Sequence, residues 1–258
     1  RLFKSRVALY EGSWLTYFAG TAFVPNGEGW PGKAKEYNAN YQYPTGSVDA
    51  EAKYFLQESA KAAEMVADKY KDQLMVNTGT IPQKEGDPQN PYFNIWGTTD
   101  MSGTPEVILW RQYSKELGVV NNVEVGVQHG DFGVGLTRSM VEGYVMKDGK
   151  PIYNSAYTYS DQTIADVATN RDPRLTIFLK VPGQKNVFKN MSAPEDHYVI
   201  DEPYPTITTR NAENDYSTGY AIRKGGTFDK ANTGNGNCYN AAEIFRATEA
   251  LLNYMEAE

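Results

Sequence analysis

The apolar residues near the start of the chain recur at the spacing of an α-helix and predict two helices joined by a long loop. In residues 2–18 the apolar face consists of Phe3, Val7, Tyr10, Trp14 and Phe18. We expect this face, including Trp14, to be buried. In residues 47–70 the apolar face consists of Ala52, Phe55, Leu56, Ala63, Val66 and Tyr70. Residues 20–46 form an unusually long loop, which indicates a role in binding or motion.

Residues 240–258 predict a third amphipathic helix. Asn240 followed by Glu243 has the spacing of a capping box, in which two side chains bond the first backbone N–H groups of a helix. The apolar face that follows consists of Ile244, Phe245, Leu251, Leu252 and Met255. We therefore expect the helix to begin at Asn240.

Residues 71–239 carry shorter and weaker patterns. We predict strands at residues 106–113 and 174–180, an extended piece at 220–223, and short helices after Thr137 and within 161–172. The glycine-rich residues 126–135 and the Pro-, Gly- and Asn-rich remainder are expected to be loops. The fold class predicted is mainly α, with long irregular loops and a few short strands.

Composition argues against several classes of function. The net charge of -7 and the pI of about 5.1 argue against a protein that neutralises nucleic-acid phosphates. The mean hydropathy is -0.58, and no apolar run is long enough to span a bilayer. Cys238 is the single cysteine, so an internal disulfide and a thiolate zinc site are both excluded.

Catalytic motifs are also missing from the sequence. His129 and His197 do not have the spacing of a metalloprotease motif, and no nucleophile elbow is present. Aromatic residues are abundant instead, with 19 Tyr, 10 Phe and 4 Trp. Tyr combines an apolar ring with a polar hydroxyl and suits half-exposed binding surfaces, although many of these rings would also fill a core.

Several segments carry specific strings of residues. The most specific is Asn170-Arg-Asp-Pro-Arg-Leu175, preceded by Val141-Glu-Gly-Tyr-Val-Met-Lys-Asp-Gly-Lys-Pro-Ile152 and followed by Thr218-Gly-Tyr-Ala-Ile-Arg-Lys224. Two helical strings complete the set: Asp49…Ala62-Ala-Glu-Met-Val66 and Arg246…Glu249-Ala250-Leu251-Leu252…Tyr254…Glu256-Ala257. In this order they resemble the signatures of the SusD/RagB family of outer-membrane nutrient-binding lipoproteins.

The resemblance implies a non-catalytic protein that binds oligosaccharides in polysaccharide utilization. Such a protein is lipid-anchored at the cell surface and delivers glycan to a SusC-type TonB-dependent transporter. The implied fold uses tetratricopeptide-type helix pairs as a scaffold. No cofactor is expected, although the family allows a calcium ion.

The resemblance also implies that residues 1–258 are a single incomplete domain, the central fragment of a longer member whose lipid anchor lies outside the fragment. Residues 1–70 and 240–258 would form the helical scaffold, and residues 71–239 would form the loop-rich, ligand-side portion. The residue types in these strings also have structural roles. Asp172-Pro173 and Asp148-Gly149 are turn formers, and Arg171 and Arg174 can pair with acids or carbonyls, so we expect them to define the fold.

Sugar rings present apolar C–H faces on which aromatic rings can stack, while amides and carboxylates bind the hydroxyls. The aromatic candidates are loop residues outside the predicted helical faces: Trp30, Tyr41, Tyr43, Trp96, Tyr157 and Tyr159. The polar candidates near them are Asn38, Asn40, Asn94 and Asp100.

Two other functions are compatible with the sequence. A glycoside hydrolase needs a pair of carboxylates, and 32 Asp and Glu make such a pair conceivable, although no pair is singled out. A helical-repeat scaffold that binds only protein is the third reading. Release of product from an oligosaccharide would favour the glycoside hydrolase. Binding to a transporter without binding to glycan would favour the protein-binding scaffold.

Overall fold

The protein is described from a computed structural model that covers residues 1–258. The structure describes residues 1–130, 134–187, 200–207 and 216–258. The chain forms two compact units. The helical unit consists of residues 1–74, 105–109 and 243–258, and the loop-rich unit consists of residues 75–104 and 110–242. No helix among the described residues is long and apolar enough to cross a membrane.

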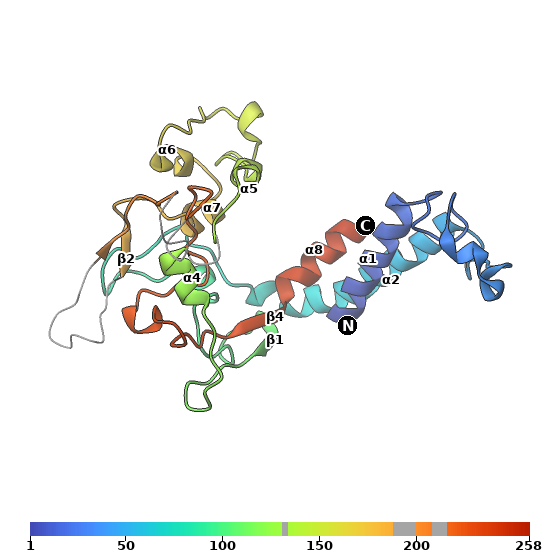
Figure 1. Cartoon of the computed structure of the whole chain (residues 1–258), viewed down its shortest axis with the longest axis horizontal. Coiled ribbons are helices and arrows are strands. Elements are labelled where there is room, and N and C mark those ends of the chain that lie inside the picture. Colours follow the sequence, from blue (N-terminus) through green and yellow to red (C-terminus); the bar gives the residue numbers. More distant parts are fainter. Residues whose placement is uncertain (131–133, 188–199, 208–215) are drawn as a thin grey trace. The chain divides into compact units, whose positions relative to one another are not determined.

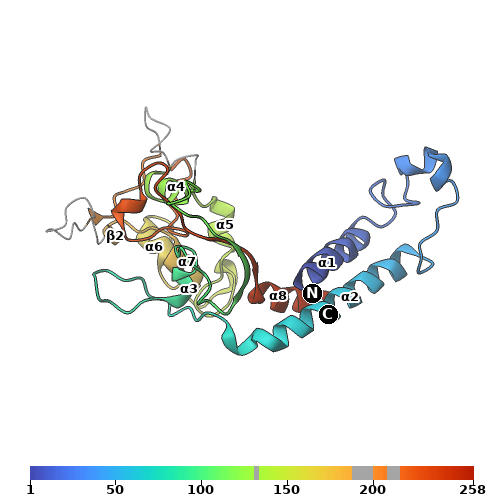
Figure 2. The same ribbon diagram turned by 90° about the horizontal axis from the view of Figure 1, so that it is seen from below.

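In the helical unit, α1 (Leu2–Tyr17), α2 (Val48–Tyr70) and α8 (Ala247–Ala257) pack side by side (Figures 1 and 2). α1 and α2 are antiparallel, because Leu2 packs near Val66 and Leu15 packs near Ala52. Ser47 caps α2 by accepting a hydrogen bond from the Ala50 N–H. The extents predicted for these two helices are confirmed. Short 3₁₀ turns lie beside them at Pro31–Ala34, Glu36–Asn38 and Lys71–Gln73.

Small side chains form the contact between α1 and its neighbours. The residues that α1 buries are Leu2, Ser5, Ala8, Gly12 and Leu15. A Cβ added to Gly12 would lie 2.8 Å from the side chain of Leu56, so the glycine is what allows α2 to approach this closely. The Ser59 hydroxyl donates to the Ser5 carbonyl, and the Asn253 amide donates to the Ser5 hydroxyl, each at 2.9 Å.

The buried face predicted for α1 is wrong in its first half. Phe3, Val7 and Tyr10 are 63%, 51% and 66% exposed. The helix instead buries its small residues. Small side chains allow the helix backbones to approach closely, and this gives denser packing than large rings would allow at a greater distance between the helices. Trp14 and Phe18 do pack against the cluster of Leu15, Val24, Tyr43 and Ala52.

The start predicted for the last helix is also wrong. Asn240 is buried and donates its side-chain N–H to the Gly225 carbonyl at 2.8 Å, so it caps no helix. The residues after it form strand β4 (Ala242–Arg246), which pairs with β1 (Val107–Arg111). α8 begins after β4, where the Ala247 N–H donates to the Glu106 carbonyl at 2.8 Å.

The loop-rich unit contains short elements joined by long irregular segments (Figure 1). Its helices are α3 (Pro91–Asn94), α4 (Val123–His129), α5 (Arg138–Gly143), α6 (Ile164–Ala168) and α7 (Pro173–Phe178). Strand β2 (Lys185–Val187) pairs antiparallel with β3 (Ile200–Asp201). Single 3₁₀ turns occur at Ile152–Asn154 and Lys230–Asn232.

Helix α7 replaces a strand that we predicted at residues 174–180. The Asp172 carboxylate accepts the Arg174 N–H at 2.8 Å, and Pro173 takes the first helical position, so the local start signal outweighs the β-propensity of Thr176 and Ile177. Two core clusters meet at this helix. Leu175 packs with Val141, Val167 and Leu179, while Ile177 and Phe178 pack with Phe93.

Residues 126–135, predicted as a loop, begin inside α4. The helix includes Gly126 and ends at Gly130, whose φ of 78° is the left-handed conformation favoured by glycine. The fold class is nevertheless as predicted: the chain is mainly helical, with a few short strands and long loops. The tetratricopeptide-type arrangement of the helices stays a prediction.

Candidate functional site

The long loop of the helical unit carries a group of aromatic and amide side chains. The ring centroids of Trp30 and Tyr41 are 5.8 Å apart, and their planes are inclined by 60°. Asn38 and Asn40 lie between them in the chain, and Tyr37 is 83% exposed. We call these five residues the aromatic loop surface. It contains four of the ten candidate residues predicted from the sequence, namely Trp30, Asn38, Asn40 and Tyr41.

Local packing holds the rings of this surface in place. The Trp30 indole lies over Gly32, where an added Cβ would be 2.3 Å from a ring carbon. Asn26, at a φ of 62°, donates its side-chain amide to the Tyr41 carbonyl at 3.0 Å. A tyrosine hydroxyl is protonated at neutral pH, and burial raises the pKa of Tyr41 further. The surface therefore offers apolar ring faces beside neutral hydrogen-bonding groups.

Tyr43, which we expected to be exposed, belongs to the core. It is 9% exposed, packs with Leu15, Val24 and Ala52, and donates its hydroxyl to the Pro25 carbonyl at 2.7 Å. The sequence placed it in a loop correctly, but a loop folded back onto helices also needs core residues. We therefore remove Tyr43 from the candidate binding residues.

Trp96 is packed more than we expected of a binding platform. Its indole makes edge contacts with Tyr92 and Phe178, at centroid distances of 6.1 and 6.2 Å. The Lys224 ammonium lies 3.6 Å from the centre of the indole, a cation–π contact. One face of the ring is thus covered by a side chain of the protein, and a role for Trp96 in binding stays a prediction.

The remaining candidates lie elsewhere in the loop-rich unit. Tyr157 is exposed, while Tyr159 is half-buried with the Arg171 guanidinium 5.1 Å from its ring centre. Asp100 is exposed and accepts the Ser102 N–H at 2.8 Å, a bond that lowers the pKa of Asp100. Asn94 lines a cleft of about 310 Å³. These residues belong to the loop-rich unit, and the aromatic loop surface belongs to the helical unit.

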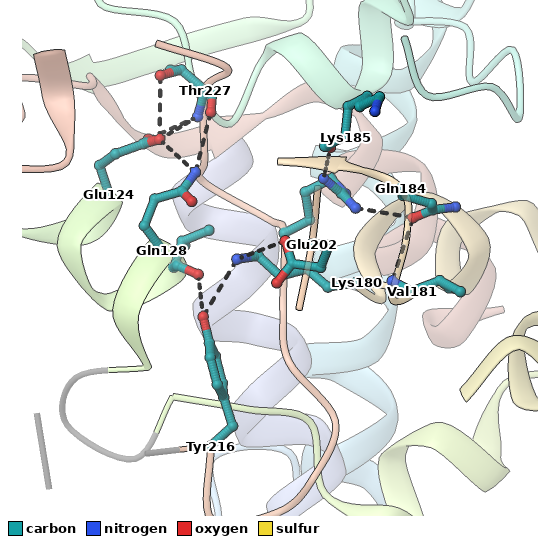
Figure 3. A network of polar contacts seen from close by, with 11 residues as sticks. Glu124, Gln128, Lys180, Val181, Gln184, Lys185, Glu202, Tyr216 and Thr227 are labelled. Carbon is teal, nitrogen blue, oxygen red and sulfur yellow. Dashed lines mark hydrogen bonds and ion pairs between the residues drawn. The ribbon is translucent and has the colours of Figure 1, made fainter. Parts of the chain in front are cut away.

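A buried network of polar side chains lies in the loop-rich unit (Figure 3). The Lys180 ammonium lies 3.4 Å from the Glu202 carboxylate and 3.4 Å from the Tyr216 hydroxyl, which donates to the Val127 carbonyl at 2.6 Å. Burial lowers the pKa of Lys180 to about 8, although the Glu202 charge opposes this. Sequence reasoning missed this network, because its members come from four separate segments.

Arg223 and Glu124 are further buried polar groups of the loop-rich unit. The Arg223 guanidinium donates to the Lys185 carbonyl at 3.0 Å and to the Gln184 side chain at 2.9 Å. Burial lowers the pKa of Arg223 to about 10 and raises the pKa of Glu124 to about 7. These groups tie loops together, which gives a unit with few regular elements a defined structure.

The strings of residues singled out in the sequence act in the same structural way. The buried Arg171 guanidinium donates to the carbonyls of Val141 and Tyr144 at 2.6 and 2.9 Å. Asp172 caps α7 and pairs with Arg174. The prediction that these residues define the fold is confirmed. His197 lies outside the described residues, and no cluster of three or more potential metal ligands occurs among the residues described.

Comparison with known proteins gives one match. A family model described as the SusD family matches residues 94–258. No curated protein and no solved structure matches the chain.

Proposed function

The chain belongs to the SusD family, and from this membership we propose that it binds glycans without cleaving them. In this proposal the protein acts in nutrient uptake at the cell surface of the outer membrane, held there by a lipid anchor. It passes bound oligosaccharide to a SusC-type TonB-dependent transporter. The observation that carries the proposal is the family match over residues 94–258.

The aromatic loop surface supports this function by its chemistry. A sugar ring has an apolar face and a rim of hydroxyls, and Trp30 with Tyr41 offers rings for the face. Asn38 and Asn40 carry amides that can donate to and accept from hydroxyls. Binding of this kind needs no titrating or nucleophilic group.

The first test replaces the rings. In the complete protein, Trp30→Ala and Tyr41→Ala should each weaken glycan binding about tenfold, because each removes a stacking partner worth on the order of 1.4 kcal/mol. Isothermal titration with an oligosaccharide identified on a glycan array would measure this. Tyr153→Ala is the matched control, since Tyr153 is 88% exposed and lies in the loop-rich unit.

The second test addresses catalysis and the partner. Incubation with the bound oligosaccharide should produce no new reducing ends, and co-purification with a SusC-type transporter should be observed. Release of product would replace the proposal with a glycoside hydrolase. Co-purification without glycan binding would replace it with a protein-binding scaffold.

A further inference from the structure

The cleft that Asn94 lines is built where two distant segments of the loop-rich unit approach each other. Its walls come from residues 89–98 and residues 226–228. Gly97 lies directly against Gly226: a Cβ on Gly97 would be 2.9 Å from the Gly226 carbonyl oxygen and 3.2 Å from the Thr227 methyl. The volume of about 310 Å³ is at the small end of the range for small-molecule pockets.

The second wall of the cleft is held from behind by buried groups. Both oxygens of the Glu124 carboxylate accept the Thr227 N–H, at 2.8 and 2.7 Å, as Figure 3 shows. The Asn240 side chain donates to the Gly225 carbonyl at 2.8 Å. These bonds are made within the protein and hold the wall in place, so the shape of the cleft is pre-organised.

The side chains that line the cleft are polar or aromatic, and none of the described lining residues is charged. Asn94 donates its amide N–H to Gln89 at 3.4 Å, which leaves the amide oxygen of Asn94 as an acceptor for a hydroxyl. Phe228 supplies a half-buried ring, and the buried Phe93 packs against it with a centroid distance of 5.9 Å. Amides beside rings, without charge, match a small hydroxylated ring that has an apolar face.

We propose that this cleft binds one ring of a neutral saccharide, with the ring face toward Phe228 and a hydroxyl donating to Asn94. A uronic acid or sulfated sugar is disfavoured, because the described lining residues provide no cation and the Glu124 carboxylate lies behind Thr227. The inference shares its ligand class with the proposed function but uses residues outside the aromatic loop surface.

The test compares glucose, galactose and glucuronate as probes of the complete protein by saturation-transfer and titration NMR. We expect the two neutral sugars to bind and glucuronate to bind at least tenfold more weakly. Asn94→Leu keeps the size of the side chain and removes its acceptor, so the neutral sugars should bind about fivefold to tenfold more weakly. Asn154→Leu is the matched control, because Asn154 is exposed and does not line the cleft.

A second pair of variants changes the shape of the cleft. In Gly97→Ala the new Cβ would clash with the Gly226 carbonyl and force the walls apart. Gly103→Ala is the control, because no atom lies within 4 Å of its new Cβ. Binding of the neutral sugars should be lost in the first and kept in the second, with thermal unfolding confirming that both fold. Any of three results would show that the cleft is not a neutral-saccharide site. These are unchanged sugar binding in Asn94→Leu, binding of glucuronate as tight as that of glucose, and no binding of either neutral sugar.

The result is separable from that of the proposed function. Loss of oligosaccharide binding in Trp30→Ala tests the proposed function, whereas the response of the neutral sugars to Asn94→Leu and Gly97→Ala tests the cleft. If the cleft variants and sugars give none of the expected results while Trp30→Ala loses oligosaccharide binding, this inference is overturned. The proposed function then still stands.

Discussion

Glu124 shows how one buried group links acid–base behaviour to the structure of the loops. Burial raises its pKa to about 7, in opposition to hydrogen bonds from Thr227, Gln128 and Asn240. The charge of Glu124 in turn raises the pKa of Lys180, against the stronger effect of burial. In the folded state the carboxyl therefore takes up a proton at a higher pH than in the unfolded chain.

This difference predicts how stability changes with pH. Folding raises the pKa of Glu124 from 4.5 to about 7, so its stabilising contribution is complete below pH 4.5 and is lost as the pH rises through 7. Glu124→Gln cannot titrate. The free energy of unfolding of the unchanged protein, minus that of the variant, should rise by up to about 3 kcal/mol from pH 7 to pH 4.5. Urea unfolding of both proteins measures it, and a pH-independent difference contradicts it.

Arg171 gives a second prediction at the residue scale. Its Nη2 donates to the carbonyls of Val141 and Tyr144, and its Nη1 donates to the Val167 carbonyl at 3.4 Å. A single ammonium cannot reproduce donors on two separate nitrogens. Arg171→Lys should lower the free energy of unfolding by about 3 kcal/mol. Arg138→Lys, at an exposed pair with Glu142, should change it by less than about 1 kcal/mol in the same urea titration.

At the scale of elements, two helices with side-chain caps were predicted correctly, and the start of a helix that is fixed by distant contacts was not. Ser47 and Thr137 cap their helices as expected. α8 has no side-chain cap, and Glu106 anchors its start instead, through the Ala247 N–H and the Arg246 side chain. A single sequence does not show that Glu106 and Arg246 meet.

The same distinction applies to the candidate site. Trp30 and Tyr41 share one loop, so their proximity followed from the sequence. Whether a loop ring faces outward depends on what the loop packs against, and Tyr43 and Trp96 turned out to be packed. The cleft was not predictable, because Gly97 and Gly226 meet only after folding.

Helix α7 allows a test of local signals. Asp172 accepts the Arg174 N–H and pairs with its guanidinium. Burial opposes ionisation of Asp172, but the bonds to Arg174 outweigh it and lower the pKa of the carboxyl. Asp172→Ala should destabilise the protein by about 1–3 kcal/mol in chemical unfolding, and Asp172→Asn, which still caps, by clearly less. Equal losses in the two variants would assign the effect to charge and not to capping.

At the scale of the whole molecule, the net charge is -7, whereas the described residues that line the cleft and the five residues of the aromatic loop surface are uncharged. Lys33, Lys35 and Glu36 lie in the same loop as that surface. Attraction between the protein and a neutral glycan would then arise from stacking and hydrogen bonds at short range. Family membership and the mainly helical class could be predicted from the strings of residues.

This arrangement predicts an affinity that is insensitive to salt. Raising the ionic strength tenfold should change the dissociation constant of a neutral oligosaccharide by less than about twofold, because no ion pair with the ligand is screened. Titration calorimetry at low and high sodium chloride measures this. A steep loss of affinity with salt would mean that charged residues of the protein bind the ligand.

The inward-facing small residues of α1 determine which substitutions the helix tolerates. Ser5, Ala8 and Gly12 are buried, and a Cβ added to Gly12 would lie 2.8 Å from the Leu56 side chain. The large apolar side chains on the other face are mostly exposed, although a hydropathy profile would predict that they are buried: Phe3, Val7 and Tyr10. In a saturation mutagenesis screen, polar replacements should therefore survive at the large positions and even conservative enlargements should fail at the small ones.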